Sequence, residues 1–98
     1  MQTLFGIASN SKAFTAAAVA QLVGQGRLNW TSRAAEVIPG LGFADDFADA
    51  RATLKDILSH RTGLPRHDHS YQPGLSSAEF VSRIKHLRPS TEFREEWQ

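Results

Sequence analysis

The amino-acid sequence predicts a mainly α-helical chain that forms part of a larger fold. Three observations lead to this prediction. A long segment with almost no charge runs from Ser9 to about Gly26, and segments at about 53–60 and 77–87 carry apolar residues at helical spacing behind capping residues. A helix that is apolar on all sides is buried on all sides, and a chain of 98 residues has difficulty surrounding such a helix alone.

The composition excludes several classes of protein. The 11 basic and 10 acidic residues nearly balance, so we expect neither nucleic-acid binding nor attraction to an anionic membrane surface. No apolar stretch reaches the roughly 20 residues that span a bilayer, so no membrane span is expected. With no cysteine, the chain has no disulfide and no thiolate metal site, and its compartment stays unknown.

The first part of the chain predicts a strand followed by a helix. Residues 4–8 are a short apolar run that is typical of the end of a buried strand. Ser9 or Asn10 can cap the helix that follows, and Gly26 can end it. The sequence therefore predicts a central helix, buried within a sizeable fold.

The middle of the chain, residues 27–52, is rich in turns and predicts a short helix at about 33–38. Asp45, Asp46 and Asp49 in this segment are interpreted as a solvated helix face. It includes Asn29-Trp30-Thr31, which fits the acceptor sequence for N-glycosylation in a secreted protein.

Two capping patterns predict the later helices. Thr53, with Asp56 three residues on, opens a helix that Gly63 and a following proline would end. Ser76 or Ser77, with Glu79, opens the last helix, which stops before a proline at position 89.

Ser9 and Lys12 are the candidate catalytic residues. They form an S-x-x-K pattern, and residues three apart on a helix lie on one face within reach of each other. A serine hydroxyl becomes a good nucleophile when a nearby base takes its proton, and a neutral lysine can do this. Burial and the positive end of the helix dipole would both favour neutral Lys12. The alternative is a serine cap followed by a solvated lysine.

A second S-x-x-K, Ser82 to Lys85, lies among basic residues on a helix face that we expect to be solvated. We interpret it as a surface coincidence. His60, His67, Asp68 and His69 raise a further hypothesis, a metal site, because His67 and His69 form a His-x-His pair that can bind a metal. No third ligand stands at a recognisable spacing from this pair, and solvated or structural histidines are the favoured interpretation.

The chain resembles the serine β-lactamase-like, or penicillin-binding-protein-like, family, which groups class C β-lactamases, D-alanyl-D-alanine carboxypeptidases and related esterases and aminopeptidases. Residues 4–16, LFGIASNSKAFTA, resemble the family's nucleophile segment. Residues 53–65, TLKDILSHRTGLP, are similar to its helix-and-turn block. The resemblance covers most of residues 4–66 and implies that residues 1–98 are the helical portion of an α/β β-lactamase/transpeptidase-like fold.

By this resemblance Ser9 is the acylated nucleophile and Lys12 is its proton acceptor. The substrate would be a small molecule or peptide with a β-lactam, D-amino-acid peptide or ester carbonyl, and no cofactor or metal is implied. Two family motifs, Tyr-x-Asn and a Lys- or His-Thr-Gly strand, are absent: Tyr71 is followed by Gln72-Pro73, and the only Thr-Gly follows Arg61. We therefore expect a partial domain that lacks N-terminal strands and the C-terminal sheet.

A different hypothesis is a non-catalytic, truncated relic that acts, if at all, as a helical interaction module. Its exposed core helix would make it adhesive. Sequence beyond Gln98 separates the two hypotheses, since a Tyr-x-Asn there favours the enzyme and a stop codon favours the relic.

Overall fold

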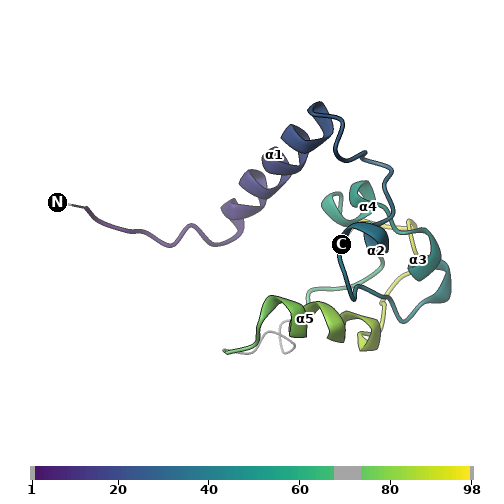
Figure 1. Cartoon of the computed structure of the whole chain (residues 1–98). Coiled ribbons are helices and arrows are strands. Elements are labelled where there is room, and N and C mark those ends of the chain that lie inside the picture. The colour runs from purple at the N-terminus through teal and green to yellow at the C-terminus, as the bar shows by residue number, and fades with distance from the viewer. Residues whose placement is uncertain (1, 68–73, 98) are drawn as a thin grey trace.

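The computed structural model describes residues 2–67 and 74–97 and is helical, with no strand in these two ranges (Figure 1). The elements in chain order are the 3-10 turn η1 (Ala8–Asn10) and the helices α1 (Ser11–Gly24), α2 (Ala34–Val37), α3 (Asp46–Arg51), α4 (Leu54–Leu58) and α5 (Ser77–Arg83), followed by the 3-10 turn η3 (Ile84–His86). The prediction of a mainly helical chain is confirmed, and the short helix expected at 33–38 is α2.

The N-terminal residues extend away from the rest of the chain (Figure 1). Residues 4–8 form no strand, so that prediction is wrong for this chain, and Leu4 and Phe5 are 97% and 82% exposed. The physical reason is that a strand needs a neighbouring strand for its backbone hydrogen bonds, and the described residues supply none.

Helix α1 is exposed in this chain, whereas the burial predicted for it belongs to a larger fold that 98 residues have difficulty supplying. None of its residues is buried, and the Phe14 side chain is 70% exposed. Only one stripe is half-buried, made of Ala16, Val19, Leu22 and Val23. The radius of gyration is 14.6 Å, larger than the roughly 13 Å of a compact 100-residue domain. Without further chain around it, the apolar helix stays open to solvent.

The start of α1 differs from the prediction and its end agrees. Neither Ser9 nor Asn10 caps the helix with its side chain; the 3-10 turn η1 leads into it, closed by the hydrogen bond from Asn10 N–H to the Ile7 carbonyl at 3.1 Å. At the end, Gly26 has φ +73° and its N–H donates to the Val23 carbonyl, while Arg27 N–H donates to the Leu22 carbonyl. These two bonds form a Schellman motif, which confirms Gly26 as the stop.

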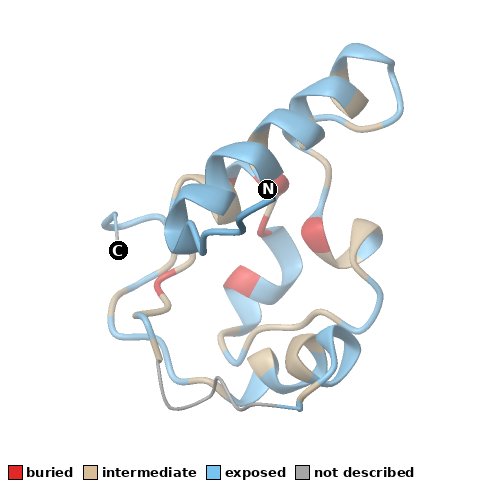
Figure 2. Cartoon of the chain, turned by 90° about the vertical axis from the view of Figure 1, so that its left-hand side faces the viewer, coloured by how far each residue is buried: buried red, intermediate tan, exposed pale blue. Residues whose placement is uncertain are grey.

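The small core lies among α2, α3 and α4 (Figure 2). Its buried apolar residues are Ala34, Ala48, Ala52 and Leu54. Because three of these are alanines, two backbone segments approach closely: Ala34 N–H donates to the Ala52 carbonyl at 2.8 Å, and Leu54 N–H donates to Ser32 at 3.1 Å. This pairing fixes the start of α4.

Both predicted capping boxes are present. Thr53 and Asp56 exchange hydrogen bonds at the start of α4, and Ser76 and Glu79 do so at α5. The hydrogen bonds from Ser76 also hold the pKa of the Glu79 carboxyl below its usual range.

Gly63 was predicted to end α4, but His60 does so. His60, with φ +56°, takes the left-handed position, and Arg61 N–H donates to the Asp56 carbonyl at 2.9 Å. The helix therefore ends at Leu58, ahead of Gly63. The last helix, expected over 77–87, is α-helical only to Arg83 and tightens into η3 before Pro89.

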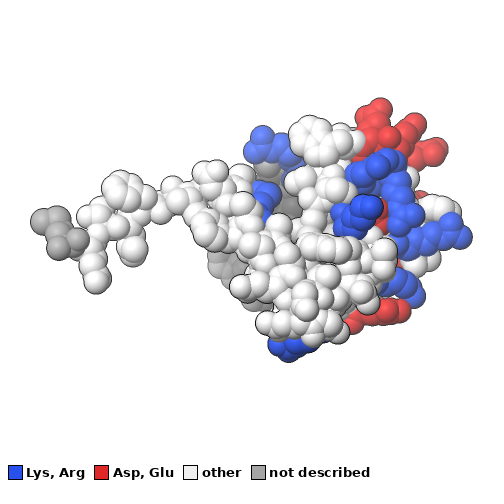
Figure 3. All heavy atoms as spheres, turned by 90° about the horizontal axis from the view of Figure 1, so that it is seen from above, with Lys and Arg blue, Asp and Glu red and all other residues white. Residues whose placement is uncertain are grey.

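Charged side chains gather on the part of the chain that contains α2 to α5, while the protruding N-terminal part presents an almost uncharged surface (Figure 3). Among the described residues, no helix combines the length and apolar composition that crossing a bilayer demands.

Candidate functional site

Ser9 and Lys12 meet at the start of α1. Ser9 lies in η1 and Lys12 lies in the first turn of α1. The Lys12 Nζ donates a hydrogen bond to the Ser9 Oγ at 3.0 Å. The sequence spacing therefore brings together the two groups that a serine–lysine nucleophile requires.

The surroundings of this pair are open. Ser9 and Lys12 are both exposed, so the burial expected to favour neutral lysine is absent in this chain. Ala8, directly before Ser9, has φ +45°, a left-handed conformation that costs an L-residue roughly 1–2 kcal/mol. The turn that presents Ser9 is thus strained, and it lies at the N-terminal, positive end of the α1 dipole.

The second S-x-x-K does not form such a pair. The Ser82 hydroxyl donates to the Glu79 backbone carbonyl at 2.7 Å, as serine often does inside a helix. Lys85 is exposed one turn further on. Ser82 and Lys85 therefore offer a matched control for Ser9 and Lys12.

The three histidines of the metal hypothesis have different surroundings. The ring of His60 packs edge-on against Trp97, with centroids 6.1 Å apart, and His67 Nε2 lies 2.7 Å from the Arg88 carbonyl oxygen. Asp68, His69 and Tyr71 lie outside the described residues. Within ranges 2–67 and 74–97, no three His, Asp or Glu side chains are grouped as a metal site.

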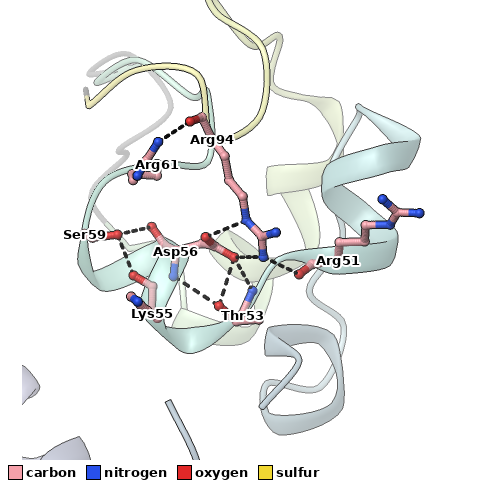
Figure 4. Close-up of polar contacts among 7 residues, drawn as sticks. All are labelled: Arg51, Thr53, Lys55, Asp56, Ser59, Arg61 and Arg94. Atoms are coloured by element: carbon pink, nitrogen blue, oxygen red, sulfur yellow. Dashed lines mark hydrogen bonds and ion pairs between the residues drawn. The ribbon is translucent and has the colours of Figure 1, made fainter. Parts of the chain in front are cut away.

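A polar cluster that sequence reasoning missed surrounds Asp56 (Figure 4). Asp56 is buried, and its carboxylate accepts from Arg94 Nε and Nη2, both at 2.9 Å, as well as from the Thr53 N–H and hydroxyl. Arg94 has φ +67°, and its N–H donates to the Arg61 carbonyl at 2.9 Å. The cluster thus attaches residues 89–95 to the start of α4.

The electrostatics of this cluster follow from these contacts. Burial alone raises the pKa of the Asp56 carboxyl, but the hydrogen bonds from Arg94 and Thr53 and the charge of Arg94 outweigh it and lower the pKa below its usual value. The same contact raises the pKa of the Arg94 guanidinium. The folded state favours the ionised form of Asp56. The carboxylate therefore stabilises the fold at pH values above the unfolded pKa of about 3.9, and this stabilisation is lost as the pH falls below that value.

Replacing Asp56 with alanine is expected to lower the free energy of unfolding by about 2–3 kcal/mol. About 1 kcal/mol comes from the loss of the capping box with Thr53, and the rest comes from the loss of the charged hydrogen bonds to the half-exposed Arg94. Urea titration at pH 7 measures the loss, which should shrink towards pH 3. The control is Glu36→Ala, which removes the exposed pair with Arg33 at 3.3 Å and should change stability little. Equal effects of the two substitutions would contradict the role of Asp56.

An open cavity of about 590 Å³ lies between α3 and the docked segment 89–95. Its lining residues are Asp45, Phe47, Pro89, Ser90, Thr91, Glu92, Phe93 and Glu95. None of them belongs to α1, so this cavity is separate from the Ser9–Lys12 pair.

Comparison with known proteins links the chain to one family. The family model described as Beta-lactamase matches residues 1–98. Unguisins hydrolase ungD of Aspergillus violaceofuscus is 41% identical over 78 residues, which are 69% of this chain and 13% of that protein.

Two bacterial relatives match over somewhat shorter lengths. Penicillin-binding protein 4 of Amycolatopsis lactamdurans is 37% identical over 62 residues, 63% of this chain and 16% of that protein. Protein flp of Staphylococcus aureus is 33% identical over 63 residues, 64% of this chain and 13% of that protein. The chain thus spans about one seventh of the length of these relatives. No solved structure matches it significantly.

Proposed function

The chain belongs to the beta-lactamase family of serine hydrolases, and on this basis we propose that Ser9 is the acylated nucleophile and Lys12 its proton acceptor. The observation that carries the proposal is the 3.0 Å hydrogen bond between Lys12 Nζ and Ser9 Oγ. It joins the two atoms between which the proton must move. A hydroxyl can donate or accept, so neutral Lys12 can accept the proton along the same line.

The proposed reaction proceeds in two steps. Ser9 Oγ attacks the substrate carbonyl carbon as Lys12 Nζ takes the hydroxyl proton, and the carbonyl oxygen becomes an oxyanion. The bond to the leaving nitrogen or oxygen then breaks, the leaving group takes the proton held by Lys12 Nζ, and an acyl-enzyme ester remains on Ser9. Water attacks this ester, releases the acid and restores the Ser9 hydroxyl. The chemistry requires no metal or organic cofactor.

We also propose that the 98 residues act within a larger catalytic domain. The uncovered apolar surface of α1 supports this, as does the small share of each relative that the chain spans. The missing part would exclude water from Lys12 and supply donors for the oxyanion, which is often the largest single contribution to such catalysis. The same part would contain the expected Tyr-x-Asn and Thr-Gly motifs.

The proposed substrates are carbonyl compounds of the β-lactam, D-amino-acid peptide or ester class. Support comes from the names of relatives, one a hydrolase of unguisins and one a penicillin-binding protein. These substrates share an electrophilic carbonyl that a serine can attack, so the same nucleophile, Ser9, and the same base, Lys12, can act on each of them.

A labelling experiment tests the proposal. A longer polypeptide with the complete domain is expected to bind a fluorescent penicillin or a fluorophosphonate at one site, and Ser9→Ala should abolish labelling. Ser82→Ala in the second S-x-x-K is the matched control and should label normally. The 98 residues alone should label far below one equivalent, because Ser9 and Lys12 are exposed to water. Undiminished labelling of the Ser9→Ala protein would refute Ser9 as the nucleophile.

A further inference from the structure

The turn that joins α1 to α2 presents an acceptor sequence for N-glycosylation. Asn29, Trp30 and Thr31 form the Asn-x-Thr pattern without proline in the middle position. Asn29 and Thr31 are both exposed, and Trp30 is 38% exposed. The whole acceptor sequence is therefore at the surface, where an N-glycan can be accommodated.

The backbone of this turn is fixed, while the Asn29 amide is available. Asn29 N–H donates to the Ser32 hydroxyl at 3.0 Å, and the Asn29 carbonyl accepts from Ser32 N–H at 3.0 Å. The Trp30 carbonyl accepts from Lys55 N–H at 2.9 Å, which ties the turn to α4. Within the described part of the chain, the side-chain amide of Asn29 makes no hydrogen bond, so modifying it breaks none of these contacts.

We propose that Asn29 is the attachment site of an N-linked glycan when the chain enters a secretory compartment. The donor is an oligosaccharide linked to a lipid pyrophosphate. A bond forms between Asn29 Nδ2 and the first sugar's anomeric carbon, and the bond from that carbon to the pyrophosphate oxygen breaks. The lipid pyrophosphate leaves, and the amide loses one proton to a base of the transferase.

The position of Asn29 is compatible with the proposed chemistry at Ser9. Leu28 N–H contacts the Leu22 carbonyl at 3.4 Å, which places the turn beside the C-terminal end of α1. Helix α1 has 14 residues and is therefore about 21 Å long, with Ser9 at its opposite end. The glycan would cover the region of Trp30 and leave the Ser9–Lys12 pair uncovered.

In vitro glycosylation tests the proposal. The purified, folded chain is incubated with a single-subunit oligosaccharyltransferase and a lipid-linked oligosaccharide, and intact mass is measured. We expect one glycan on the native chain, loss of it in Asn29→Gln and Thr31→Ala, and its retention in Thr31→Ser. Asn10, an exposed asparagine outside an acceptor sequence, is the internal control and should stay unmodified.

A peptide of residues 27–33 in the same reaction separates two ways in which the proposal can fail. If the peptide is modified and the folded chain is not, the fold hides Asn29. If neither is modified, Asn29-Trp30-Thr31 is no acceptor. Either result overturns the proposal.

Discussion

Replacing Lys12 with methionine is expected to slow acylation of Ser9 by about 10²–10⁴-fold in the complete domain, the usual contribution of a positioned general base. Methionine is unbranched and only one atom shorter than lysine, but it has no basic nitrogen, so no group remains at 3.0 Å from Ser9 Oγ to take the proton. The measurement is the single-turnover rate of acylation by a chromogenic β-lactam or ester.

The control for this substitution is Lys85→Met in the second S-x-x-K. Because the Ser82 hydroxyl donates to a backbone carbonyl, Lys85 has no nucleophile to activate and its loss should leave the rate unchanged. A Lys12→Met protein that acylates at the normal rate would mean that another group is the base.

Replacing Gly63 with alanine is expected to lower the free energy of unfolding by about 2–5 kcal/mol, from left-handed strain and from overpacking. Gly63 has φ +83°, and an added Cβ would lie 2.5 Å from the Thr91 backbone oxygen. The Gly63 carbonyl also accepts from Ser90 N–H at 2.9 Å. Alanine would therefore separate segment 89–95 from the loop after α4. Urea unfolding and hydrogen exchange at the Ser90 and Arg94 amides measure the effect.

Gly40→Ala is the matched control, because Gly40 has φ +81° and nothing within 4 Å of an added Cβ. It should cost only the strain, about 1–2 kcal/mol, and leave exchange at Ser90 unchanged. If the Gly63 and Gly40 substitutions lowered the free energy of unfolding equally, the close approach of the added Cβ to Thr91 would contribute nothing to the loss, and the predicted overpacking would be wrong.

Local features of the fold could be predicted from the sequence. The capping boxes at Thr53 and Ser76 and the Schellman stop at Gly26 each depend on residues within one or two turns. The Ser9–Lys12 contact is of the same kind, since three residues along a helical turn bring the two side chains together. Such short-range geometry is nearly independent of the rest of the molecule.

Features that depend on distant residues could not be predicted. Asp56 is recognisable as a capping residue, but nothing in the sequence marks Arg94, 38 positions away, as its ion-pair partner. The exposure of α1 and the missing strand at 4–8 have a related cause. Burial and strand pairing both depend on the surrounding chain. An apolar pattern therefore indicates that a segment is suited to burial, but it does not show whether other residues are present to cover or pair with that segment.

The central claim is that Ser9 is acylated with Lys12 as its base, and mapping the covalent adduct tests it most directly. The complete domain would be reacted with a fluorophosphonate or a slowly hydrolysed β-lactam, digested, and sequenced by mass spectrometry. The prediction is one adduct per molecule, located on Ser9 and strongly reduced in Lys12→Met. An adduct on any other residue, with Ser9 unmodified, would contradict it.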